Sequence, residues 1–147
     1  MRVYLDACCL NRPFDDQTQD RIHLETEAII LILNRLEKLP NWEWIGSEVL
    51  DFEINQTPDP ERRHQVKLLI NDVRYSVIVN QKEIERAKQL ETMGFHSYDA
   101  LHIACAESSN VDILLTTDDQ LLNKANKLSE QLNIRVENPL TWLKEAL

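Results

Sequence analysis

Short apolar runs typical of buried β-strands alternate along this chain with longer segments of helical periodicity. Such alternation implies a parallel sheet with helices on both of its faces. We therefore expect an α/β fold of three layers, α/β/α, around a central parallel sheet of about five strands. The predicted strands cover residues 2–6, 42–45, 75–79, 112–116 and 133–136; a loop is expected over 11–16, and helices over 18–38, 47–55, 59–72, 81–92, 97–108, 119–130 and from Pro139 onward.

The length of 147 residues suits one domain with a sizeable core, and we expect a single domain over residues 1–147. No internal repeat, low-complexity tract or linker interrupts the sequence. No apolar run approaches the ~18–20 residues that span a bilayer, and the first residues resemble a strand rather than a signal peptide. The expected location is therefore the cytoplasm, without membrane association.

The formal net charge of −9 counts against nucleic-acid binding, because such binding usually leaves a basic footprint. A metal site built from carboxylates would itself contribute about four negative charges, which softens the objection. Arg12, Arg62 and Arg63 are the best candidates for phosphate contacts, although most basic residues are expected on solvated helix faces. The charge thus weakens a nucleic-acid interpretation without excluding it.

The three cysteines, Cys8, Cys9 and Cys105, are an odd number and lack the spacing of zinc-binding pairs. We expect small buried side chains in a reducing compartment, with a redox role as the alternative.

Four carboxylates stand where a parallel sheet would bring them together. Asp6 and Asp118 each follow an apolar run predicted as a strand. Asp99 opens an apolar helical stretch, and Glu53 lies in the helix expected after residues 42–45. The ligand crevice of an open α/β sheet lies beyond the carboxyl ends of its strands, where the strand order reverses. Because acids gathered there repel one another unless cations lie between them, the arrangement predicts a divalent-metal site.

Each acid alone has an ordinary structural explanation. Asp6 could cap a turn or helix after its strand, and the helix dipole favours an acid such as Asp99 in a first turn. Asp118 or Asp119 could be the N-cap of the following helix. The metal-site hypothesis therefore rests on the set of acids and not on any single member.

The fourth acid and the role of His102 stay open at this point. Glu48 and Glu53 compete for the fourth place, and periodicity does not decide between them. His102 follows Asp99 by three residues on one helix face, so it could orient a carboxylate or contact substrate. A packed helix histidine is the commoner case.

Missing motifs exclude several classes of α/β protein. The sequence has no Gly-rich phosphate loop and no G-x-G-x-x-G fingerprint, which argues against nucleotide-binding folds. It has no G-x-S-x-G elbow, so an α/β-hydrolase is excluded. A phosphoacceptor receiver domain would need adjacent acids after the first strand, where Ala7 and Cys8 stand instead.

Four motifs in order along the chain carry a family resemblance. They are Val3-Tyr4-Leu5-Asp6, Ser47 with Glu53 six residues later, Tyr-Asp-Ala-Leu-His-Ile-Ala at 98–104, and Leu-Leu-Thr-x-Asp at 114–118. In these motifs the sequence resembles the PIN-domain family, and within it the small VapC-type toxin ribonucleases. The resemblance covers essentially the whole chain, and the last two motifs together are fairly specific.

The resemblance implies hydrolysis of RNA phosphodiester bonds with Mg²⁺ or Mn²⁺ as cofactor. It selects Glu53 over Glu48, and it implies that Asp6, Glu53, Asp99 and Asp118 are catalytic, with Asp6, Asp99 and Asp118 as metal ligands. Asn11, Asp119 and His102 are possible auxiliary residues. One departure is that Cys8 occupies the place of an asparagine in many relatives; the nearby Asn11 either substitutes for it or serves another purpose.

Partners follow from the same resemblance. A toxin of this kind has a protein antitoxin, and the helix over 18–38 could support a homodimer, although burial within the monomer explains its apolar face equally well. The alternative function is a catalytically inactive PIN-like binding or regulatory module that acts through a protein partner.

Overall fold

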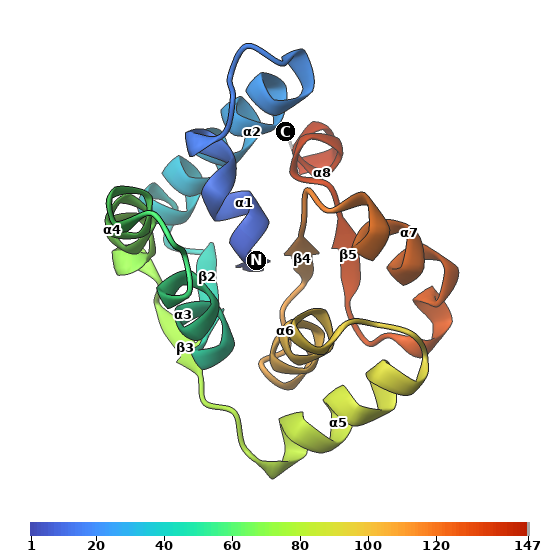
Figure 1. Ribbon diagram of the computed structural model, residues 1–147. Coiled ribbons are helices and arrows are strands. Elements are labelled where there is room, and N and C mark those ends of the chain that lie inside the picture. Colours follow the sequence, from blue (N-terminus) through green and yellow to red (C-terminus); the bar gives the residue numbers. More distant parts are fainter. Residues whose placement is uncertain (147) are drawn as a thin grey trace.

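The computed structural model of the protein describes residues 1–146 and contains the expected three-layer α/β/α arrangement (Figure 1). Its central sheet is entirely parallel, with the strand order β3-β2-β1-β4-β5. The strands are β1 Arg2–Leu5, β2 Glu43–Ser47, β3 Tyr75–Val77, β4 Ile113–Leu115 and β5 Arg135–Glu137. The predicted fold class is confirmed.

The strand order reverses between β1 and β4, which lie side by side at the centre of the sheet. Val3 pairs with Ile113 and Leu5 with Leu115, so the two strands end level with each other. A crevice for a ligand is expected beyond the carboxyl ends at such a reversal.

Helices cover both faces of the sheet. They are α1 Ala7–Asn11, α2 Asp20–Lys38, α3 Glu48–Asn55, α4 Pro60–Leu69, α5 Gln81–Thr92, α6 Ser97–Ser108, α7 Asp119–Lys127 and α8 Pro139–Ala146, with 3₁₀ turns η1 Arg12–Phe14, η2 Ile70–Asp72 and η3 Ser129–Gln131. Because side chains alternate along a strand, β1 contributes to two separate cores. Val3 and Leu5 pack with α2 and α8, whereas Tyr4 packs with α5 and α6.

The structure differs from the sequence-based prediction mainly after β1. Part of the loop predicted over residues 11–16 is helical, and a separate short helix, α1, precedes it. This helix forms because Asp6 accepts a hydrogen bond from the backbone N–H of Cys9, an interaction that caps its first turn. The third strand ends at Val77 and α7 ends at Lys127, both earlier than predicted.

Within residues 1–146, no helix combines the length and the apolar composition that a membrane crossing requires.

Candidate active site

The acids predicted from the sequence lie on four elements that meet at the carboxyl end of the sheet. Asp6 follows β1 directly, and Asp118 comes just after β4 as the N-cap of α7. Glu53 lies on α3, which follows β2 directly, and Asp99 lies in the first turn of α6. The pKa of Asp99 is raised, first by burial and then by the negative charge of Asp118, with Glu53 adding to it. Asp99 therefore lies close enough to Asp118 and Glu53 for their charges to act on it, although within residues 1–146 no three of the four acids bring carboxylate oxygens within 4.8 Å of one another.

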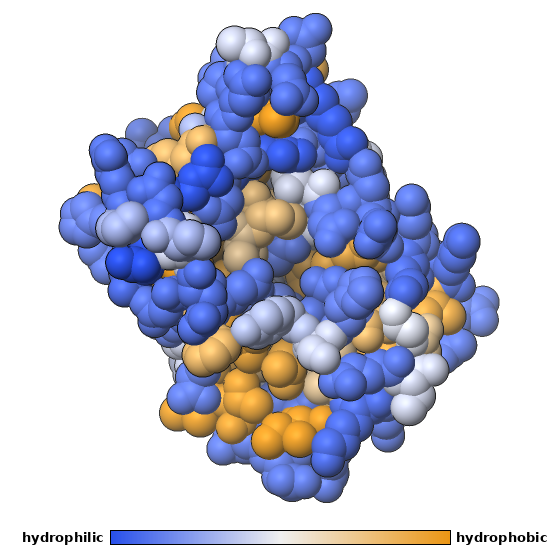
Figure 2. All heavy atoms as spheres, in the orientation of Figure 1, coloured by the Kyte–Doolittle hydropathy of each residue, from blue (hydrophilic) through white to orange (hydrophobic). Residues whose placement is uncertain are grey.

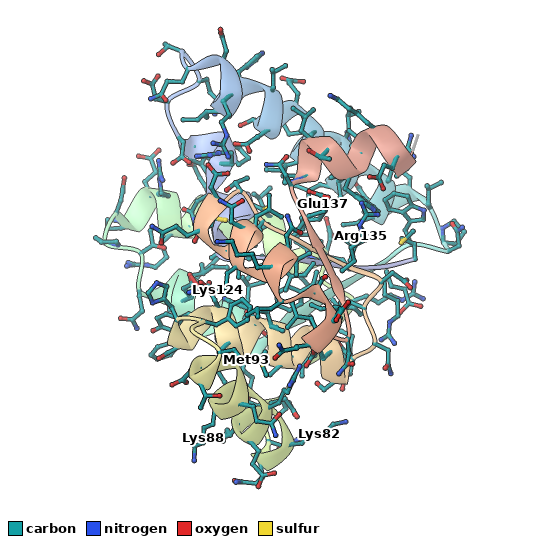
Figure 3. All side chains as sticks on the ribbon, turned by 90° about the vertical axis from the view of Figure 1, so that its right-hand side faces the viewer. Lys82, Lys88, Met93, Lys124, Arg135 and Glu137 are labelled. Atoms are coloured by element: carbon teal, nitrogen blue, oxygen red, sulfur yellow. The ribbon has the colours of Figure 1, made fainter. Side chains whose placement is uncertain are left out.

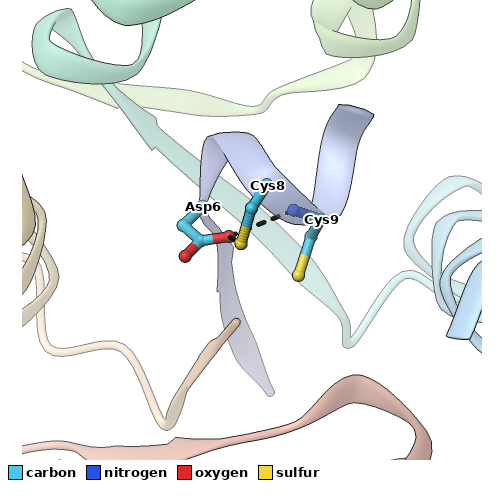
Figure 4. Close-up of side chains that lie close together, drawn as sticks. All are labelled: Asp6, Cys8 and Cys9. Atoms are coloured by element: carbon cyan, nitrogen blue, oxygen red, sulfur yellow. Dashed lines mark hydrogen bonds between the residues drawn. The ribbon is translucent and has the colours of Figure 1, made fainter. Parts of the chain in front are cut away.

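Asp6 is a buried carboxylate, with 5% of its surface exposed. Its Oδ1 accepts hydrogen bonds from the Cys9 backbone N–H at 3.1 Å and from the Cys8 thiol at 2.7 Å. The other oxygen points away from both cysteines (Figure 4). Burial raises the pKa of Asp6 well above its ordinary value, and the neighbouring Cys8 raises it further. Asp6 therefore caps α1 with one oxygen and presents the other at the end of β1.

Glu53 is held in place by a chain of buried hydrogen bonds. His102, only 2% exposed, lies with Nε2 at 2.7 Å from Glu53 Oε1 and Nδ1 at 2.5 Å from the Tyr4 hydroxyl. The Tyr4 hydroxyl lies 2.6 Å from Ser47 Oγ, which accepts the N–H of Leu50 at 3.1 Å. Every group has a partner when each proton points toward Glu53, with His102 donating from Nε2 and accepting at Nδ1. His102 therefore orients a carboxylate, one of the two roles that its spacing suggested.

Removing the Tyr4 hydroxyl should destabilise the protein measurably. In Tyr4→Phe, Ser47 Oγ and His102 Nδ1 lose a buried partner, so the free energy of unfolding should fall by about 1–3 kcal/mol. Tyr75→Phe is the matched control, because Tyr75 is 54% exposed on the edge strand β3. Urea unfolding of both variants measures the effect. Equal stability of Tyr4→Phe, Tyr75→Phe and wild type would contradict a stabilising role for the buried hydrogen bonds of Tyr4.

Asp118 and Asp119 have different surroundings. Asp118 Oδ1 accepts the backbone N–H of Gln120 at 2.9 Å, so Asp118 is the helix cap as well as a member of the acid group. Asp119 instead forms a bidentate pair with Arg21 of α2, with both N···O distances 2.7 Å. The hydrogen bonds from Arg21 lower the pKa of Asp119. This pairing occupies both oxygens of Asp119 and directs them toward α2.

The arginines considered for phosphate contacts are engaged within the protein. Arg12 pairs with Glu25 at 2.8 Å and with Asp15 at 3.2 Å, and Arg62 pairs with Asp15 at 3.0 Å. Arg63 donates to the carbonyl of Thr57 at 2.9 Å. These side chains mainly join α1, α2 and α4 to their neighbouring loops.

Among residues 1–146, one trio of potential metal-ligating atoms lies within 4.8 Å of one another: those of Asp6, Cys8 and Cys9 (Figure 4). Cys9 is fully buried, and its thiol donates to the carbonyl of Leu115 at 3.3 Å. This sulfur faces the core, so we do not regard the trio as a metal centre. All three cysteines of the chain are free thiols; Cys9 and Cys105 are buried as expected, whereas Cys8 is only partly buried, because it lies beside Asp6 at the end of the sheet.

No protein-family model matches this sequence, and no curated protein does so either. Solved structures do match. One is a crystal structure of VapBC2 from Rickettsia felis bound to a DNA fragment from its promoter. It superposes with a TM-score of 0.59 at 16% sequence identity, over 94% of this chain and 98% of that chain. VapBC-1 from nontypeable Haemophilus influenzae superposes with a TM-score of 0.58 and 14% identity over 95% of this chain and 98% of that chain. The chain has the VapC-type PIN fold.

On this PIN fold, Cys8 rather than Asn11 takes up the interactions beside the first acid. The Cys8 sulfur accepts the N–H of Thr117 at 3.3 Å while its thiol donates to Asp6. It thereby connects the end of β1 to the segment that leads from β4 to Asp118. Asn11 donates to the carbonyl of Ala7 at 2.9 Å, a local contact within α1.

Two features of the site could not be read from residue spacing alone. Tyr4 looks like an ordinary core residue of β1, and only the packing of α6 against the sheet brings its hydroxyl to His102. The contact of Cys8 with Thr117 depends on the turn of α1 that Asp6 caps; the sequence indicated a cap at Asp6 as one alternative but did not predict α1 itself. A signal for the first feature was available, since a tyrosine in a fully buried strand needs a partner for its hydroxyl.

Proposed function

We propose that this protein is a Mg²⁺- or Mn²⁺-dependent endoribonuclease that hydrolyses RNA phosphodiester bonds. The observation that carries the proposal is the placement of Asp6 and Asp118 just after the neighbouring strands β1 and β4, with Asp99 close enough to Asp118 and Glu53 for their charges to raise its pKa. Within residues 1–146, none of these four acids forms a salt bridge with a lysine or an arginine. A divalent cation would offset part of their negative charge.

The donor set fits such an ion. Magnesium and manganese prefer carboxylate and water oxygens, and magnesium commonly keeps several waters while bound by one or two carboxylates. Asp6 offers the oxygen that faces away from the cysteines, and Asp99 and Asp118 offer further carboxylates. A bound ion would supply charge stabilisation for the phosphate and an activated water.

Glu53 has a separate role in this proposal. His102 engages its Oε1, and Oε2 is the oxygen left to accept a hydrogen bond from the attacking water. The buried chain through Tyr4 prevents the imidazole from turning away. Glu53 therefore orients the water, while the three aspartates hold the cation.

An exposed aromatic pair beside the acids favours a single-stranded nucleic acid as substrate. Phe52 and Tyr98 immediately precede Glu53 and Asp99, are 55% and 42% exposed, and lie with ring centroids 6.3 Å apart. Unstacked bases of single strands bind to exposed aromatic rings of this kind.

We also propose a protein partner of the antitoxin type. The two matching structures are VapBC assemblies, and this chain has exposed apolar surface for an assembly. Figure 2 shows apolar side chains gathered at the lower edge of the face near α5, where Ile78 and Ile84 are 59% and 37% exposed. On α2, Ile29 is buried in the monomer, but Leu24 and Leu31 face outward and could form a homodimer contact.

Cleavage of a labelled single-stranded RNA by the purified protein tests the function. We expect products with Mg²⁺ or Mn²⁺, none with excess chelator, and recovery when the metal is restored. Matched single-stranded DNA and duplex RNA are the controls for substrate class. Absence of cleavage under every metal condition would favour the inactive binding module, which the Cys8 departure and the net charge of −9 also suggest.

A further inference from the structure

A cleft of about 470 Å³ opens beside the acids, between the turn that precedes α6 and the helix α7. Asp99 is one of its lining residues, so the cleft is continuous with the proposed active site. Its size falls within the ~300–1,000 Å³ typical of pockets for small ligands. A group that enters it would lie next to whatever is held by the acids.

The cleft carries basic side chains next to the acids. Lys124 and Lys127 of α7 line it, together with His96. The Lys124 ammonium donates a hydrogen bond to the carbonyl of Gly94. This hydrogen bond holds the positive charge at the wall of the cleft and leaves two N–H groups of the ammonium free to donate. No lysine of residues 1–146 forms a salt bridge, so what distinguishes Lys124 and Lys127, in a chain with a net charge of −9, is that both line a cleft beside the acids.

The rest of the lining consists of two amides, Gln120 and Asn123, and four apolar side chains. Met93 and Leu128 are partly buried, and Phe95 and Leu121 close the floor with 5% and 2% exposure. Figure 3 shows Met93 and Lys124 on this face, with Lys82 and Lys88 farther down, on α5. An apolar floor with cations at its rim suits a flat heterocycle that carries a phosphate.

We propose that this cleft is a nucleotide subsite for the RNA strand next to the bond that is cleaved. The base packs against Met93 and Leu128, and the adjoining phosphate lies at Lys124 and Lys127. This inference rests on the proposed function for its substrate class. A phosphodiester strand suits both parts of the surface, because one phosphate reaches the acids with their cation while the next reaches the lysines. The subsite therefore provides local positive charge for RNA binding, which the net charge of the whole chain does not indicate.

Salt dependence of RNA binding tests the subsite without any cleavage. A labelled single-stranded RNA is titrated with protein in excess chelator at several salt concentrations, and affinity is measured by fluorescence anisotropy. In Lys124→Gln with Lys127→Gln, the slope of log affinity against log salt should become less steep by about 0.7, the value for one lost phosphate contact on a single strand. Lys82→Gln with Lys88→Gln is the matched control on α5 and should leave the slope unchanged.

Methionine NMR locates the contact independently. The chain has two methionines, Met1 at the start of β1 and Met93 in the cleft, so their methyl signals can be told apart by substitution. RNA should shift the Met93 methyl resonance and leave that of Met1 in place. Melting temperature and Mn²⁺ affinity of the α7 double variant should match wild type, which shows that the fold and the acids are intact.

The outcomes separate this inference from the proposed function. An unchanged salt slope in the α7 double variant, or a Met93 signal that RNA does not move, overturns the subsite even if the protein cleaves RNA. Loss of slope with a shifted Met93 signal supports the subsite even if no metal condition gives cleavage, in which case the nuclease proposal alone fails.

Discussion

Asp6→Asn should abolish RNA cleavage and at the same time make the metal-free protein more stable. The substitution removes one charge from the metal-binding group, and we expect a loss of about 10²-fold or more in kcat/KM, equivalent to several kcal/mol of lost charge stabilisation. Asparagine is also a good N-cap, so the hydrogen bond from Cys9 that starts α1 can be kept. Cleavage assays and thermal unfolding on the same preparation measure both effects.

The stability gain follows from the direction of the pKa shifts. Burial raises the pKa of Asp6 and of Asp99 above the ordinary value of 3.8. The folded chain therefore holds these protons more tightly than the unfolded chain, and the free energy of unfolding falls as the pH rises from about 4 through the raised values. In Asp6→Asn, the part of this fall that comes from Asp6 should be absent. The Tm at neutral pH should therefore rise by about 4 °C for each kcal/mol gained in the free energy of unfolding.

Asp20→Asn is the control for this prediction, because Asp20 is an exposed aspartate at the start of α2. It should change neither cleavage nor the pH dependence of stability. Added Mn²⁺ should raise the Tm of wild type and of Asp20→Asn but not of Asp6→Asn, since only a bound ion stabilises the folded state. Full RNA cleavage by Asp6→Asn would show that Asp6 is not part of the active site.

Glu25→Ala should be strongly destabilising, although Glu25 lies away from the acids. The Glu25 side chain is 2% exposed and is bound by Arg12 at 2.8 Å, by Arg21 at 3.4 Å and by the Asn138 amide at 2.6 Å. These contacts join η1 and α2 to the residue that precedes α8. Removing the acid leaves the half-buried Arg12 without its main partner, and we expect a loss of about 3 kcal/mol in the free energy of unfolding.

Glu27→Ala is the matched control, because Glu27 lies on the exposed face of the same helix. Its effect should stay within about 0.5 kcal/mol. Urea unfolding of the two variants gives the comparison, and a loss for Glu25→Ala no larger than that for Glu27→Ala would show that the buried cluster contributes little.

The sequence predicts the sheet and the placement of the acids because both depend on local patterns. Strand ends can be located from apolar runs, and parallel strands carry their following residues to one edge, so Asp6 and Asp118 could be placed together. Glu53 required the family resemblance, since the helix periodicity left Glu48 equally possible. In the structure Glu48 instead accepts the backbone N–H of Val79 at 2.8 Å.

What the sequence did not predict depends on contacts between distant segments. The chain from Ser47 through Tyr4 to His102 joins three elements whose packing distances are not encoded in any one of them. The burial of Glu25 had a signal, because it lies on the same helix stripe as the buried Ala28 and Ile29. An acid on an apolar stripe needs a buried partner, but the partners Arg12 and Asn138 emerge only from the fold.

Calorimetric titration of Mn²⁺ into the wild-type protein tests the central claim, that Asp6, Asp99 and Asp118 hold a divalent metal ion. The account predicts binding by the wild type, little or none by the double variant Asp6→Asn with Asp118→Asn, and a normal fold of that variant by circular dichroism. A wild-type protein that binds no Mn²⁺, or a double variant that binds it equally well, would contradict the metal site and the nuclease proposal built on it.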